Sequence, residues 1–324
     1  MVAFHKASAI FKLMIVVTVF IYNKGDFLMA IKKVTVAGSG VLGSQIAFQS
    51  AFKGFDVTVY DINQEAVDKA AERIKGLRHA YRTDIDATDE EFNAGIGRLR
   101  FTDDLADAVK DADLVIEAIP ENPKIKRDFY KKIGNLAPKS AIFTSNSSTL
   151  VPSMFAADTG RPKQFLNMHF ANQVWLNNTA EIMGSPETDP AIYDEIVAYA
   201  RQIGMIPIQL KKEQPGYILN SLLIPFLDAA EQLWLKGIAD PQMIDRTWIA
   251  ATGSPFGPFG ILDAVGIRTA YNITAAELKD HPELQPIADR LKELLDQGKL
   301  GMESGEGFYK YPDPEFKKPE FLNE

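Results

Sequence analysis

The sequence has 324 residues, of which 46% are hydrophobic and 24% are charged, so it can bury the cores of two globular domains. It contains no cysteine, which excludes disulfide bonds, thiol nucleophiles and cysteine-ligated metals. Its net charge of −8 argues against binding to nucleic acid or to an anionic membrane surface. We expect a cytoplasmic protein whose partner is a small molecule.

The first 28 residues do not share the patterning of the rest. The apolar run at residues 13–22 is short, since a membrane-spanning helix needs about 20 residues. A signal peptide is an alternative, but no small-x-small cleavage site follows. Lys-Gly-Asp before Met29 can be encoded by purine-rich codons that resemble a ribosome-binding site, so we interpret residues 1–28 as a leader or a mis-assigned start. Codons without a purine-rich stretch at this place would contradict that interpretation.

The next segment reads as strand, glycine turn, helix and strand, with the sequence KKVTVAGSGVLGSQIAFQSAFKGFDVTVYD. In its G-x-G-x-x-G motif, Gly38 permits a tight turn, Gly40 lets the backbone approach a pyrophosphate, and Gly43 allows close packing. The start of the helix offers N–H groups and a positive dipole end to phosphates. The residues expected to contact them are Gly38, Gly40, Val41, Leu42 and Gly43.

Asp61 ends the second strand, 18 residues after Gly43. A carboxylate at this place accepts hydrogen bonds from the ribose hydroxyls of adenosine and repels a 2′-phosphate. The pattern therefore predicts a Rossmann-type domain that prefers NAD to NADP. The alternative is a glycine-rich turn in an unrelated α/β protein.

Two further buried strands are predicted within residues 112–120 and 140–148, with a helix at 123–136 between them. Ligands of parallel sheets bind beyond the carboxyl ends of the strands. Four polar residues are expected there, near the working end of the cofactor: Glu117, Glu121, Asn146 and Ser148. Each has the alternative role of a helix cap or a solvated loop residue.

His169 lies in the apolar stretch FLNMHF, and Glu181 follows twelve positions later. A lone histidine in such a setting is more often a packed core residue than a base. An imidazole with a pKa near 6.5 is nevertheless suited to take the hydroxyl proton of an alcohol as hydride leaves carbon. A carboxylate on its other nitrogen would fix the tautomer and stabilise the imidazolium. This chemistry requires no metal ion, and the sequence offers no obvious cluster of metal ligands.

The second half of the chain is predicted to be helical after a last strand at 205–210. A long apolar helix at 215–239 is expected to be buried on most sides. We predict an α/β fold in which an N-terminal doubly wound sheet precedes a smaller all-α domain. The predicted boundaries are 29–211 for the NAD-binding domain and 212–324 for a substrate and dimerisation domain.

Several motifs spread over residues 31–311 resemble the L-3-hydroxyacyl-CoA dehydrogenase family, and its 3-hydroxybutyryl-CoA dehydrogenases in particular. They are VAGSGVLGSQIA, ADLVIEAIPENPKIK, IFTSNSSTL, LNMHF with Glu181, PGYILN, GSPFGPFGILDAVG and GEGFYKY. The resemblance implies an NAD-dependent enzyme that oxidises an L-3-hydroxyacyl-CoA in fatty acid metabolism. It also implies a homodimer formed through the helical domain.

The resemblance carries residue roles onto this sequence. It implies that His169 and Glu181 form the catalytic pair and that Ser148 and Asn220 hold the substrate oxygen. It adds Glu121 and Lys126 near the nicotinamide ribose. The cofactor-binding residues are then Gly38, Gly40, Val41, Leu42, Gly43, Asp61, Glu121, Lys126, Ser148 and Asn172.

Departures from the family pattern concern the substrate. Trp175 stands where the family has small or apolar residues, which suggests a short or polar substrate or, alternatively, ordinary packing. The acidic stretch at 84–91 would repel the phosphates of coenzyme A unless it is a solvated helix face. A free 3-hydroxy acid, as in L-gulonate and L-carnitine dehydrogenases, is therefore an alternative substrate. A non-catalytic NAD-binding structural or sensor protein is an alternative of another class.

Overall fold

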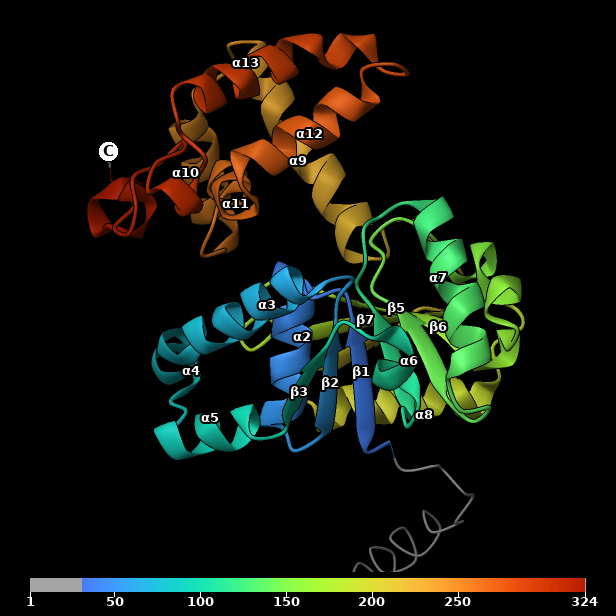
Figure 1. The fold of residues 1–324 in the computed structure, drawn as a ribbon. Coiled ribbons are helices and arrows are strands. Elements are labelled where there is room, and N and C mark those ends of the chain that lie inside the picture. Colours follow the sequence, from blue (N-terminus) through green and yellow to red (C-terminus); the bar gives the residue numbers. More distant parts are fainter. Residues whose placement is uncertain (1–30, 324) are drawn as a thin grey trace, which may run out of the picture. The chain divides into compact units, whose positions relative to one another are not determined.

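The computed structural model describes residues 31–323, and the proposed leader at 1–28 lies outside them. The chain divides into two compact units, one ending at Tyr217 and one beginning at Ile218 (Figure 1). None of the helices in the described part is long and apolar enough to cross a membrane.

An eight-stranded sheet forms the centre of the first unit, in the order β3-β2-β1-β4-β5-β6-β7-β8. Neighbouring strands are parallel except for β6 and β7, which pair in antiparallel fashion. The strands are β1 (Lys33–Ala37), β2 (Asp56–Tyr60), β3 (Leu99–Thr102), β4 (Leu114–Glu117), β5 (Ile142–Ser145), β6 (Phe165–Phe170), β7 (Thr179–Gly184) and β8 (Ile206–Gln209).

Helices cover both faces of this sheet (Figure 1). They are α2 (Val41–Phe52), α3 (Gln64–Gly76), α4 (Arg78–Ile85), α5 (Asp89–Ile96), α6 (Leu105–Val109), α7 (Pro123–Leu136) and α8 (Pro190–Gln202). Alternation along the strands explains the two layers, since successive side chains point to opposite faces. In β4, Leu114 and Ile116 join the core under α2 and α8, whereas Val115 joins the core under α6 and α7. The predicted doubly wound Rossmann-type sheet is thus confirmed.

The second unit is built from α9 (Leu219–Leu235), α10 (Pro241–Thr252), α11 (Pro258–Val265), α12 (Ile267–Glu277) and α13 (Gln285–Asp296). Its caps follow from the sequence: Asp240 accepts from the backbone N–H of Met243 at the start of α10, and Gly253 ends that helix in the left-handed region. The all-helical character predicted for this half is confirmed.

Two buried aspartates hold the C-terminal segment of this unit together. Asp245 accepts from the N–H groups of Phe259 and Gly260 at the start of α11. Asp263 accepts from the N–H groups of Phe308 and Tyr309, and the Tyr309 hydroxyl donates back to Asp245. The glycine-rich motif around Gly260 and the later motif around Tyr309 are therefore two sides of one hydrogen-bonded core.

The long helix α9 is less buried than its composition predicts. Only Leu227, Ala230 and Glu231 of its residues are buried, and Leu222 is 69% exposed. Its apolar residues run around the helix, so one packing face within the unit cannot cover them all. An uncovered apolar face of this kind is typical of a surface that binds another protein surface.

Candidate active site

The glycine turn follows β1 and leads directly into α2. Gly38 has φ +95°, a conformation that favours glycine, and a side chain there would overlap the carbonyl oxygen of Ala118. A side chain on Gly43 would overlap the Gly38 carbonyl, so the turn and the helix could not approach as they do. Gly40 borders open space instead, which leaves its backbone accessible to a ligand. The exposed Val41 and the half-buried Leu42 begin α2.

Asp61 faces this turn from the end of β2. One oxygen of its carboxylate accepts from the backbone N–H of Ser39 at 2.8 Å and from the Ser39 hydroxyl at 2.6 Å. The other accepts from the N–H of Ile62. A cavity of about 650 Å³ opens beside Gly38, Gly40 and Asp61. An accessible backbone, a helix N-terminus and a fixed carboxylate around one cavity fit a dinucleotide whose ribose carries free hydroxyls.

The spacing of twelve between His169 and Glu181 is the register of an antiparallel strand pair. The two residues are directly opposite each other on β6 and β7. The Nδ1 atom of His169 lies 3.2 Å from a carboxylate oxygen of Glu181, and both side chains are buried. Nδ1–H therefore donates to Glu181, which leaves Nε2 of the neutral ring as the acceptor.

Ser148 lies beyond the end of β5 and reaches the free nitrogen of this histidine. Its hydroxyl oxygen is 3.1 Å from Nε2 of His169. Asn146, two residues earlier, accepts from the backbone N–H of Phe170 at 2.9 Å and so ties the loop after β5 to the end of β6. The structure thus joins the histidine, the glutamate and the serine in one hydrogen-bonded chain.

Tyr217 supports the histidine from its other side, which the sequence analysis did not foresee. The two rings are stacked, with their centroids 4.6 Å apart and their planes at 15°. The Tyr217 hydroxyl donates to the carbonyl oxygen of Ser147 at 2.7 Å and accepts from the side-chain amide of Asn167. Tyr217 has φ +54°, which is unusual for a residue with a side chain and is overcome here by these contacts. The only signal in the sequence is the aromatic residue in PGYILN.

Glu117 is a buried structural centre rather than a residue open to a ligand. It is fully buried at the end of β4, and one carboxylate oxygen accepts from Nζ of Lys126 at 2.5 Å and from the N–H of Ile119. The other oxygen accepts from the hydroxyls of Tyr130 and Ser145, at 2.6 and 2.8 Å. Every lone-pair direction of this carboxylate therefore has a donor within the protein.

Lys126 is buried together with Glu117 and extends the network to Glu121. Its ammonium lies 3.2 Å from the Glu121 carboxylate, which is 39% exposed. Glu121 also accepts hydrogen bonds from Ser147 and Thr149 in the loop after β5. Burial acts to raise the pKa of Glu121, but the Ser147 hydrogen bond and the charge of Lys126 outweigh it and hold this pKa below its usual value. The carboxylate stays ionised beside the serine-bearing loop.

Two of the predicted residues are not members of this hydrogen-bonded chain. Asn172 is exposed in the loop after β6, where its carbonyl accepts from the side chain of Asn177. Asn220 lies in the first turn of α9, within the second unit.

Trp175 anchors the loop between β6 and β7 to α4. Its indole N–H donates to Asp84 at 2.9 Å, and its ring packs 5.2 Å from the ring of Tyr81. Asp89 pairs with Arg78, so two acids of the 84–91 stretch already have partners within the chain. These contacts favour the packing interpretation of Trp175.

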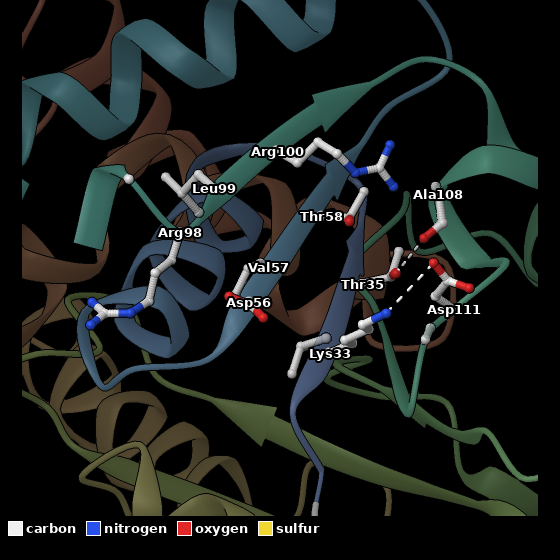
Figure 2. Close-up of a pocket in the computed structure, with 13 residues that line it drawn as sticks. Lys33, Thr35, Asp56, Val57, Thr58, Arg98, Leu99, Arg100, Ala108 and Asp111 are labelled. Atoms are coloured by element: carbon white, nitrogen blue, oxygen red, sulfur yellow. Dashed lines mark hydrogen bonds and ion pairs between the residues drawn. The ribbon is translucent and has the colours of Figure 1, made fainter. Parts of the chain in front are cut away.

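A separate polar cavity of about 300 Å³ lies at the opposite, amino ends of β1 to β3 (Figure 2). Its three cations all have partners: Lys33 pairs with Asp111, Arg100 pairs with Asp107, and Arg98 donates to backbone carbonyls. Ligands of parallel sheets bind at the carboxyl ends, so the functional site is the one around the glycine turn and His169.

The fold and this site define a class, the NAD-dependent oxidoreductases that act on a secondary alcohol. The NAD-binding domain of 3-hydroxyacyl-CoA dehydrogenases matches residues 33–214, and the C-terminal domain of the same enzymes matches residues 216–311. The chain belongs to the 3-hydroxyacyl-CoA dehydrogenase family, and NAD is its cofactor.

Similar proteins of known name cover nearly the same region. A probable 3-hydroxybutyryl-CoA dehydrogenase of Deinococcus radiodurans is 34% identical over 86% of this chain and all of its own length. The mitochondrial hydroxyacyl-coenzyme A dehydrogenase of Homo sapiens is 32% identical over 87% of this chain and 91% of its own. The solved structure of a diketoreductase acting on dicarbonyl compounds is 55% identical, with a TM-score of 0.84 over 88% of this chain and all of that one.

Proposed function

We propose that the protein interconverts an L-3-hydroxyacyl-CoA of short chain length and the corresponding 3-ketoacyl-CoA, with His169 as the general base and Glu181 as the group that orients it. The observation that carries the proposal is the hydrogen-bonded chain from Glu181 through His169 to Ser148. This chain leaves a single proton-accepting atom, Nε2, next to a hydroxyl that can bind the substrate oxygen.

In the oxidising direction, Nε2 of His169 takes the proton of the substrate hydroxyl. The buried Glu181 carboxylate stabilises the imidazolium that results and keeps the ring in the correct tautomer. In the reducing direction the imidazolium returns this proton, while Ser148 donates to the carbonyl oxygen on which charge develops. We assign the second donor to that oxygen to Asn220.

NAD, when bound, accepts or supplies the hydride. Gly38, Gly40 and the start of α2 would hold its pyrophosphate, and Asp61 the adenosine ribose. We place Glu121 and Lys126 beside the nicotinamide end, with Asn172 at the rim. Because Lys126 is buried, it acts there by fixing Glu121 and the loop after β5 rather than by direct contact.

A free dicarbonyl compound is a second candidate substrate, favoured by two observations. The diketoreductase is 55% identical to this chain. In addition, four of the five lysine and arginine residues of α3 and α4, which could meet the phosphates of coenzyme A, are engaged within the chain: Lys69 with Glu65, Lys75 with Glu72, Arg78 with Asp89, and Arg73 with a backbone carbonyl. The fifth, Arg82, is exposed. Both candidates share a keto group two carbons from a second carbonyl, so the same proton relay serves either.

We further propose that the protein acts as a cytoplasmic homodimer joined through its second unit. A cavity of about 490 Å³ between α9 and α10 is lined almost entirely by apolar residues, among them Phe226, Leu233 and Trp248. Exposed apolar surface of this kind is typical of subunit interfaces.

The test compares NADH oxidation with acetoacetyl-CoA, free acetoacetate and pentane-2,4-dione, using the wild type, His169→Gln and His79→Gln. His79 is an exposed histidine of α4 and serves as the matched control. We expect His169→Gln to lower kcat by roughly 10²- to 10⁴-fold with NADH affinity unchanged, and His79→Gln to behave as wild type. Near-normal turnover of His169→Gln would remove this residue from the mechanism. Turnover of the thioester alone supports the first candidate, and turnover of the free compounds alone supports the second.

A further inference from the structure

Glu231 is a buried residue of the described chain, and one of its carboxylate oxygens has no hydrogen-bond partner there. It lies in the second half of α9 and is only 4% exposed. Its Oε1 atom has no hydrogen-bond partner in the described chain. A buried carboxylate oxygen of this kind is costly, because burial removes its hydration and no donor of the described chain replaces it. The contrast with Glu117, whose two oxygens accept four hydrogen bonds, shows what a satisfied carboxylate looks like in this fold.

Glu231 lines a small, half-open pocket between α9, α11 and α12, all within the second unit. The cavity has a volume of about 50 Å³. Asp228, one helical turn before Glu231, also lines it, and the walls are aliphatic, among them Ile224, Leu262 and Ile273. The pocket is therefore largely apolar and carries two carboxylates, the buried Glu231 and the exposed Asp228.

The charges around this cavity all have the same sign. Its described lining contains no lysine, arginine or histidine. Burial, followed by the charge of Asp228, raises the pKa of Glu231 to about 7, and burial with the charge of Glu277 raises the pKa of Asp228. A positive charge placed here would relieve both the repulsion and the missing hydrogen bond.

The size and the aliphatic lining of the pocket indicate which kind of cation fits it. No group of three or more acidic or histidine side chains in residues 31–323 is placed to hold a metal ion. A cavity of about 50 Å³ exceeds the space that one water needs and suits a compact polar head. Aliphatic walls suit a hydrocarbon stem, since long basic side chains bury their methylene groups along apolar surface.

We propose that this cavity binds the cationic head of an aliphatic chain, an alkylammonium or alkylguanidinium group, with Glu231 as the main acceptor and Asp228 as the second. This site is separate in sequence from the proposed catalytic residues, and its assignment does not rest on the proposed reaction. The cation is either part of a free small molecule or the lysine or arginine side chain of a second copy of this chain.

The first experiment titrates the full-length protein with butylamine and with agmatine and follows binding by calorimetry and by the unfolding temperature. Butan-1-ol serves as the uncharged probe. The variants are Glu231→Gln, which keeps the shape and removes the charge, and Glu293→Gln, which removes one exposed acid from α13 of the same unit. We expect saturable binding of a cationic probe to wild type and Glu293→Gln, weakened roughly 10- to 100-fold in Glu231→Gln.

Sedimentation equilibrium distinguishes the two sources of the cation. If a second copy supplies it, the probes compete with self-association, and Glu231→Gln dissociates at a higher concentration than Glu293→Gln does. If the source is a free molecule, the probes bind and the state of association does not change. Equal behaviour of Glu231→Gln and Glu293→Gln in both measurements would overturn the proposal, and Glu231 would then be a protonated or hydrated core residue.

Discussion

The buried pair of Glu117 and Lys126 provides the sharpest test of how this site is held together. Three variants probe it: Lys126→Met, Glu117→Gln and the double variant with both changes. Glutamine matches glutamate in length and methionine is one atom shorter than lysine, so each variant removes charge while keeping most of the volume. The pair lies 2.5 Å apart, and both residues are almost completely buried.

The magnitude follows from what each single change leaves behind. Breaking one partner out of a buried ion pair costs about 3–5 kcal/mol, because the remaining charge is buried and uncompensated. Glu117→Gln leaves the Lys126 ammonium with the Glu121 carboxylate at 3.2 Å and the Ile119 carbonyl oxygen at 3.5 Å. Lys126→Met leaves the carboxylate with three neutral donors, Ile119, Tyr130 and Ser145. These remaining partners place both single variants near the low end, at about 3 kcal/mol.

The double variant is expected to be less destabilised than the sum of the single variants by at least about 1 kcal/mol, since no uncompensated charge remains. Differential scanning fluorimetry of the full-length protein measures this. The transition that NADH shifts upward belongs to the NAD-binding unit. For a unit of this size, about 3 kcal/mol corresponds to a fall of roughly 6–12 °C in the unfolding temperature.

The reasoning fails if the two single effects simply add up in the double variant, because the pair would then have no mutual dependence. It also fails if Lys126→Met leaves the unfolding temperature within about 2 °C of wild type while raising the KM for NADH many-fold. That combination would mean that Lys126 contacts the cofactor and contributes little to the core.

Three further outcomes are expected. Asp61→Ser should raise the ratio of NADPH to NADH use, measured as kcat/KM, by roughly 10- to 100-fold, because it removes a charge that repels a 2′-phosphate; an unchanged ratio would contradict the role of Asp61. Trp175→Phe keeps the packing on Tyr81 but loses the hydrogen bond to Asp84, so it should lower the unfolding temperature slightly. The chain-length preference for acyl-CoA substrates should not change. A shift toward longer acyl chains would place the indole at the acyl site instead. Burial raises the pKa of Asp245 to about 6, above its usual 3.8, so the folded state holds the proton more tightly than the unfolded state does. The unfolding free energy of the helical unit should therefore fall as pH rises from about 4 to 7. A flat or rising profile of unfolding temperature over this range would show that the buried carboxylate is not destabilising when ionised.

The predictable part of the fold and the unpredictable part differ in the range of the interactions involved. The glycine turn, Asp61 and the alternating strands are local patterns, and each reports its own geometry through a few neighbouring residues. The pairing of His169 with Glu181 was visible only as a spacing of twelve, which became a contact once β6 and β7 paired in register. Tyr217 gave no such signal, because its stacking partner lies 48 positions earlier in the chain and on another element.

Glu117 and Glu231 show why burial is harder to infer than position. Glu117 ends a strand, so its place at the edge of the sheet follows from the sequence, yet its function depends on donors from α7 and β5 that fill both oxygens. Glu231 falls within an apolar helical pattern, where a glutamate would be expected at a solvated position, and the packing of α11 and α12 buries it instead. The two acids are therefore alike in burial and differ in the hydrogen bonds that their carboxylates accept. A hydrogen-bonded carboxylate stabilises its surroundings, whereas a buried carboxylate without donors is stabilised when a cation binds to it. The first kind positions the loop that carries Ser148, and the second kind is the reason to look for a ligand in the helical unit.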